Sequence, residues 1–88
     1  MDVGSFDGLI ARMAAAARAD RAGWQRDGWQ RAAAAIAGTA APFVEWAREH
    51  RRWRYVVAEA GETVCAKPRE AAAWIAHAIV EELLEEDD

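Results

Sequence analysis

Alanine and tryptophan together limit what kind of core this chain can build. Alanine accounts for 23 of the 88 residues, and the five tryptophans stand at positions 24, 29, 46, 53 and 74. Helices rich in alanine can approach one another closely, and each tryptophan can bury about 150–250 Å² in the remaining space. A chain this short is near the lower limit for a self-sufficient core. We therefore expect one small domain over residues 1–88 that depends on its tryptophans.

Charge is divided unevenly along the chain. From Leu9 to Arg54, nine arginines stand against four acidic residues, whereas from Tyr55 onward two basic residues stand against nine acidic ones. The first segment has a net charge of +5, the second of −7, and the whole chain of −4. The sequence predicts a basic helical half joined to an acidic half that ends in a frayed tail over residues 85–88.

Two features bear on location. Cys65 is the only cysteine, so no internal disulfide can form, which fits a reducing compartment. No apolar stretch approaches the roughly 18–20 residues that a membrane span requires. We expect a cytoplasmic protein with no membrane partner.

The tetrapeptide Gly-Trp-Gln-Arg occurs twice, five residues apart, with Asp27 between the copies. Positions five apart are separated by about 140° around a helix, so the two tryptophans would point to different sides. Each glycine also weakens a helix interior by about 1 kcal/mol. The pattern favours a helix over about residues 7–21, capped by Asp7 and ending near Gly23, and a second over about 28–38, capped by Asp27. One long helix over residues 7–38 is the alternative.

The rest of the chain predicts a mixture of helix and strand. Thr39 and Pro42 mark the start of a third helix, and Pro68 opens a last helix with Trp74 beside its apolar core face. Between them, WRYVVAE (53–59) and TVCAK (63–67) flank Ala60-Gly61 and favour a two-stranded antiparallel hairpin. The expected fold is α+β in the order ααα-ββ-α: three N-terminal helices, the hairpin and a C-terminal helix.

Residues suited to catalysis or metal binding are scarce. His50 and His77 are the only histidines, and no ligand spacing connects either of them to a metal-binding set. Cys65 falls in an apolar strand, where an inert thiol is expected, and Ser5 is the only serine. No glycine-rich phosphate loop is present. We expect a protein that is not an enzyme and uses no metal or other cofactor.

Two charged segments are candidate interaction surfaces. In REHRRWRY (48–55), arginines alternate with aromatic residues that could stack on a partner, although both aromatics could instead turn into the core. EELLEEDD (81–88) could dock a basic partner or mimic nucleic acid, or could simply solubilise the chain. The pattern leaves open whether the basic or the acidic segment binds. The candidates are Arg48, Arg51, Arg52, Trp53, Arg54, Glu81, Glu82, Glu85 and Glu86.

These features favour a non-enzymatic protein-binding inhibitor or adaptor. Its small size and acidity are typical of proteins encoded by phages or mobile elements and directed at a host defence complex or another cognate protein. The alternative is a small nucleic-acid-binding protein that uses the Arg-rich helical half, which the net negative charge and single lysine disfavour. A further hypothesis is a homodimer whose hairpins pair edge to edge through residues 53–67.

Overall fold

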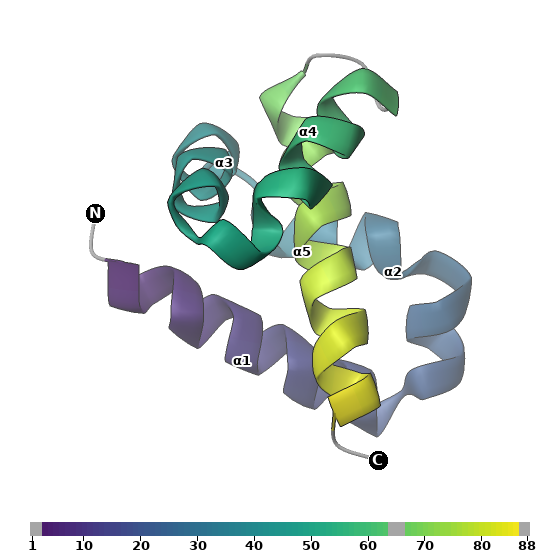
Figure 1. Cartoon of the computed structure of the whole chain (residues 1–88). Helices are drawn as coiled ribbons and strands as arrows, with labels where there is room; N and C mark the ends of the chain where they lie inside the picture. The colour runs from purple at the N-terminus through teal and green to yellow at the C-terminus, as the bar shows by residue number, and fades with distance from the viewer. Residues whose placement is uncertain (1–2, 64–66, 87–88) are drawn as a thin grey trace.

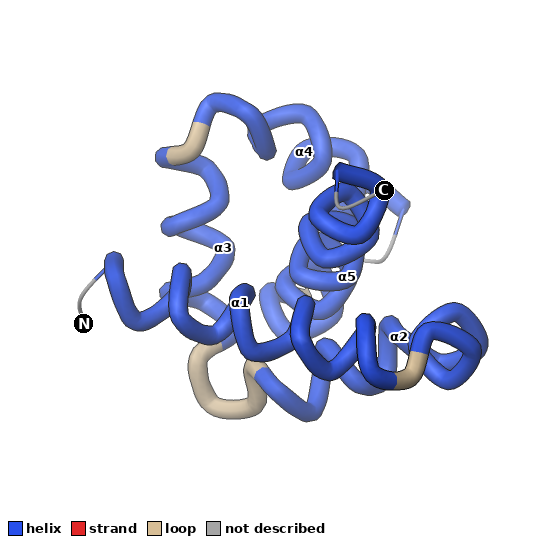
Figure 2. Tube along the Cα trace, turned by 90° about the horizontal axis from the view of Figure 1, so that it is seen from below, coloured by secondary structure: helices blue, strands red, loops and turns tan. Residues whose placement is uncertain are grey.

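The computed structural model describes residues 3–63 and 67–86, and all regular structure within these ranges is helical. The elements in chain order are α1 (Val3–Ala19), α2 (Arg21–Ala35), α3 (Ala40–Glu49), the short 3₁₀ helix η1 (Arg51–Trp53), α4 (Arg54–Thr63) and α5 (Pro68–Glu86). Figure 1 shows α5 crossing the middle of the molecule. Figure 2, which looks nearly along α5, shows the other four α-helices arranged around it.

The composition of α5 explains its central place. It contacts α1, α2, α3 and α4, and most of its residues between positions 71 and 80 are buried. Its small residues allow neighbouring backbones to approach, and its branched residues fill the space between them. The buried positions of α5 are Ala71, Ala72, Ala73, Ile75, Ala76, Ile79 and Val80.

Aromatic side chains join α1 and α3 beside this central helix. The Phe6 and Phe43 rings meet edge to face with their centroids 5.7 Å apart, and Phe43 lies 5.3 Å from Trp46. Trp24 and Trp53 are also buried. Three of the five tryptophans therefore fill the core between alanine-rich helices, as their spacing and volume led us to expect. Trp74 was wrongly expected in the core: it is 42% exposed.

The predicted hairpin, and with it the α+β class, is wrong. Residues 54–63 form α4, while Val64, Cys65 and Ala66 of the expected second strand lie outside the described residues. Trp53 and Val57 are buried and Val56 is half-buried, which is the i, i+3, i+4 stripe of a helix packed on one side. This stripe packs α4 against α3 and α5, and such packing outweighs the strand propensity of valine. The edge-to-edge homodimer loses its basis with the hairpin.

The helices of the N-terminal half differ from both predicted arrangements, the two helices over about residues 7–21 and 28–38 and the single helix over 7–38. α1 begins at Val3, so Asp7 is an exposed residue within the helix and not its cap. The chain breaks at Asp20, which caps α2, and not near Gly23. Neither a helix ending at 21 nor one continuous helix over 7–38 is therefore correct.

Several local signals were interpreted correctly. Asp27 has non-helical backbone angles (φ −138°, ψ 33°) and kinks α2, at the residue where a second helix was expected to begin. Thr39 is the N-cap residue of α3, and α5 begins at Pro68. Within the ranges that the structure describes, no helix has both the length and the apolar character needed to span a bilayer.

Candidate functional site

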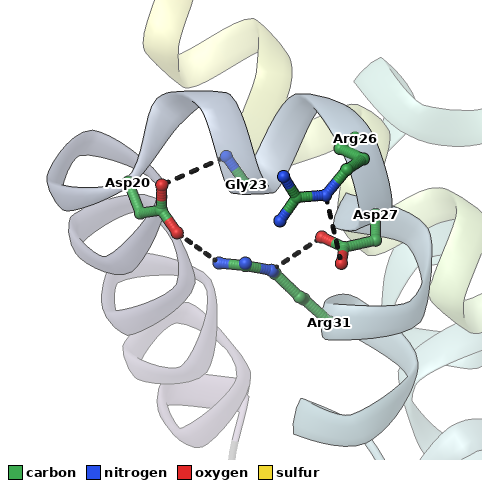
Figure 3. Close-up of polar contacts among 5 residues, drawn as sticks. All are labelled: Asp20, Gly23, Arg26, Asp27 and Arg31. Carbon is green, nitrogen blue, oxygen red and sulfur yellow. Dashed lines mark hydrogen bonds and ion pairs between the residues drawn. The ribbon is translucent and has the colours of Figure 1, made fainter.

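The duplicated Gly-Trp-Gln-Arg segment has a structural role, shown in Figure 3. Asp20 accepts a hydrogen bond from the Gly23 backbone N–H at 3.1 Å and another from Arg31 Nη1 at 3.2 Å. Arg31 Nε also donates to Asp27 Oδ1 at 2.9 Å. Arg31, from the second copy, thus joins the carboxylate at the α1–α2 break to the carboxylate at the α2 kink. The Gly23 N–H and the Arg31 guanidinium together hold the pKa of Asp20 below its usual value.

The glycine of the second copy allows α2 to lie against His77 of α5. A Cβ at Gly28 would stand 2.7 Å from His77 Cε1 and Nδ1, a separation that real side chains do not adopt. His77 Nε2 lies 3.2 Å from Glu81 Oε1, and the ring centroids of Trp24 and Trp74 are 6.2 and 6.3 Å from the imidazole. His77 is therefore a packed residue of the α2–α5 contact.

The acidic candidates lie along the last turns of α5. Glu81 and Glu85 line a pocket of about 280 Å³, with Arg21, Trp24, Gln25 and Leu84 forming the rest of its wall. Glu82 is half-buried, and Glu86 is exposed. The guanidinium of Arg21 in the same pocket offsets part of the negative charge, so this surface has only a weak preference for a cationic partner.

The basic candidates are gathered where three elements meet. Arg48 lies near the end of α3, Arg51 opens η1 and Arg54 opens α4, and all three are exposed. Trp53 is only 8% exposed and is therefore removed from the candidate surface, whereas Tyr55 is 79% exposed. We call Arg48, Arg51, Arg54 and Tyr55 the basic corner. The Arg52 side chain lies outside the part of the chain that the structure describes.

Hydrogen bonds and ring packing fix the backbone beneath the basic corner. His50 Nδ1 donates to the Trp46 carbonyl at 2.7 Å, and its ring centroid lies 4.2 Å from that of Trp46. The Trp53 backbone N–H donates to the His50 carbonyl at 2.8 Å. His50 and two buried tryptophans therefore hold the turn between α3 and α4 in one conformation.

Of the three arginines in the basic corner, one forms an ion pair with a carboxylate of this chain and two form none with any described residue. Arg48 Nη1 lies 3.6 Å from Glu45 Oε1, one turn away on α3. Arg51 and Arg54 form no ion pair with any residue in the described ranges. Their charges are therefore available to an acidic group on a partner.

Side chains suited to catalysis or metal binding are not grouped in the described part of the chain. Among residues 3–63 and 67–86, no three of the His, Cys, Asp and Glu side chains are placed to hold a metal ion. His50 bonds to a backbone carbonyl and His77 to Glu81, on different helices. Cys65 lies outside the described residues.

Comparisons with known proteins add no family to this description. No family model matches the chain, and no significant match was found among curated proteins or solved structures. The function must therefore be argued from the surface itself.

Sequence reasoning missed the most exposed aromatic residue. Tyr55 was expected to share a strand face with Trp53, because alternate residues of a strand point the same way. In a helix, residues two apart are separated by about 200°, so burial of Trp53 turns Tyr55 outward. The spacing of Trp53, Val56 and Val57 was the signal that could have revealed this.

Proposed function

We propose that the protein is a non-enzymatic protein-binding inhibitor or adaptor that contacts its partner through the basic corner. The observation that carries this proposal is Tyr55, which is 79% exposed and directly follows Arg54 in the chain. Arg51 and Arg54 are exposed and form no ion pair with any described residue. Tyrosine and arginine are enriched at the energetic centres of protein interfaces, and an exposed tyrosine loses little conformational entropy on binding.

Charge favours an acidic protein surface as the partner. The rest of the chain offsets the basic corner, so that the molecule carries −4 overall. Nucleic acid presents a long line of phosphates that would also meet the negative regions of the molecule. An acidic patch on a protein can contact the basic corner without meeting the negative regions of the molecule. Electrostatic complementarity of that kind speeds the association of two proteins and fixes their relative orientation.

The first experiment is affinity capture from extracts of cells that express the gene, with three variants compared in parallel. Tyr55→Ala and the double variant Arg51→Glu/Arg54→Glu alter the basic corner. Arg69→Glu makes the same kind of charge reversal at an exposed position on α5. We expect one protein to be retained by the wild type and by Arg69→Glu but lost with both corner variants. With the purified partner, Tyr55→Ala should weaken binding by about 30-fold, as expected for an interface hot spot of about 2 kcal/mol.

Unfolding measurements on each variant serve as the folding control, because Tyr55 is exposed and its removal should leave the melting temperature unchanged. Equal retention of the partner by the corner variants and by Arg69→Glu would refute the proposal. So would a partner that is lost only with Arg69→Glu.

A second assay separates proteins from nucleic acids as partners. We expect no micromolar binding to duplex or single-stranded DNA or RNA at physiological ionic strength, measured by fluorescence anisotropy. Binding that falls steeply with salt and disappears in Arg51→Glu/Arg54→Glu would replace protein binding with the nucleic-acid alternative.

A further inference from the structure

A second surface lies between α1 and α2, where the two helices enclose an open groove of about 510 Å³. This volume is within the roughly 300–1,000 Å³ range of ligand pockets. The α1 residues of the groove have the spacing i, i+3, i+4 and i+7, so they form one face over two helical turns. The lining residues are Leu9, Arg12, Met13 and Ala16 from α1, and Trp24, Arg31 and Ala35 from α2.

The lining combines an apolar surface with positive charge and contains no carboxylate. Of its two arginines, Arg31 is already bonded to Asp20 and Asp27. Arg12 is exposed and forms no ion pair within the described ranges. The groove thus presents the half-buried Leu9 and the exposed Ala16 beside a cation whose charge is not balanced locally. Met13 and Trp24, which also line it, are buried.

We infer that this groove binds a carboxylate that carries an apolar chain, of the medium-chain fatty-acid class. The chain would lie on Leu9 and Ala16, and the carboxylate would bond to the Arg12 guanidinium, whose planar donors match two carboxylate oxygens. A neutral alcohol of the same length would make the apolar contacts without the charged bond. An alkylammonium ion would be repelled by Arg12, whose charge is not balanced locally, and would gain no bond from Arg31, which is paired with two carboxylates.

An NMR titration with decanoate, decanol and decyltrimethylammonium tests this inference. The reporters are the backbone amides of residues 9–16 and the indole N–H of Trp24, which is buried and has no hydrogen-bond acceptor among the described groups. Decanoate, kept below its micelle concentration, should shift these signals saturably. Decanol should bind more weakly, and decyltrimethylammonium should leave the signals unchanged.

Three variants locate the site. Arg12→Gln should weaken decanoate binding by about tenfold, because one charge-assisted bond is lost. Ala16→Leu should abolish binding by filling the groove from an exposed position that a larger side chain can occupy without entering the core. Arg54→Gln, on the basic corner, is the matched control and should bind decanoate as the wild type does.

The inference is overturned if decanoate leaves the reporters unshifted, if the ammonium ion binds equally well, or if Arg12→Gln and Ala16→Leu bind like the wild type. It is independent of the proposed protein-binding function, because no residue that lines the groove belongs to the basic corner, so Arg12→Gln and Ala16→Leu leave that corner unchanged.

Discussion

At the scale of single residues, Gly28 and His77 show how closely α2 approaches α5. The imidazole occupies the space that a Cβ at position 28 would need, and the ring centroids of Trp24 and Trp74 lie 6.2 and 6.3 Å from that of His77. The His77 side chain is 16% exposed, so a Cβ at position 28 would require a shift of the imidazole or of the two helix backbones. A glycine that weakens helix propensity is therefore favoured here by a tertiary contact.

We predict that Gly28→Ala lowers the free energy of unfolding by about 1–3 kcal/mol, the usual cost of overpacking. Gly8→Ala is the matched control, because a Cβ at Gly8 meets no atom within 4 Å. That substitution should raise the free energy of unfolding by about 0.5–1 kcal/mol through helix propensity. Urea unfolding of both variants checks the prediction, and a stabilised Gly28→Ala protein would show that the helices are farther apart.

At the scale of elements, the α1–α2 break and the α2 kink depend on Asp20, Asp27 and Arg31. Asp20 caps α2 through the Gly23 N–H, and Arg31 binds both carboxylates. The sequence marked this region correctly through its glycines and aspartates. It did not show that the two aspartates share one arginine, because Arg31 stands eleven residues after Asp20 in the chain.

The lowered pKa of Asp20 makes its contribution to stability depend on pH. Because the pKa of Asp20 in the folded protein lies below the ordinary aspartate value of 3.8, this contribution is present above pH 3.8 and is lost as the pH falls through the folded-state pKa. Asp20→Asn retains a cap acceptor but removes the charge. We predict that it is less stable than the wild type at neutral pH and that the difference narrows in acid. A carboxyl NMR titration should also show the pKa of Asp20 rising in Arg31→Gln, and an unchanged value would contradict the ion pair.

Elements differed in how well local sequence predicted them. Thr39 and Pro68 were recognised as helix starts because threonine is favoured at N-cap positions and proline is tolerated in a first helical turn, and both preferences belong to the residue itself. The segment after Trp53 was misread because Val56, Val57 and Tyr55 favour strands, and because glycine at 61 resembles a turn. The segment is helical because Trp53 and Val57 are buried against α3 and α5. Local residue propensities carry no information about such tertiary contacts.

At the scale of the whole molecule, the uneven charge of the sequence becomes separate surfaces. Arg48, Arg51 and Arg54 meet at the turn into α4, whereas Glu81, Glu85 and Glu86 follow the C-terminal end of α5, at the bottom of Figure 1. The two groups of charged candidates were chosen from charge alone, and their role in binding stays a prediction. Charge could not show that Trp53 is buried and Tyr55 is exposed, because that inference requires the correct secondary structure of this segment.

The central claim is that helical packing after residue 53 buries Trp53 and exposes Tyr55 as the centre of a protein-binding corner. In a strand the two side chains would share a face, whereas in a helix they lie about 200° apart. Hydroxyl-radical footprinting with mass spectrometry measures both in one experiment, each relative to the same residue in the unfolded chain. We predict strong protection of Trp53 and near-complete labelling of Tyr55. Equal protection of the two residues, or protection of Tyr55 alone, would contradict both the fold of this segment and the proposed binding surface.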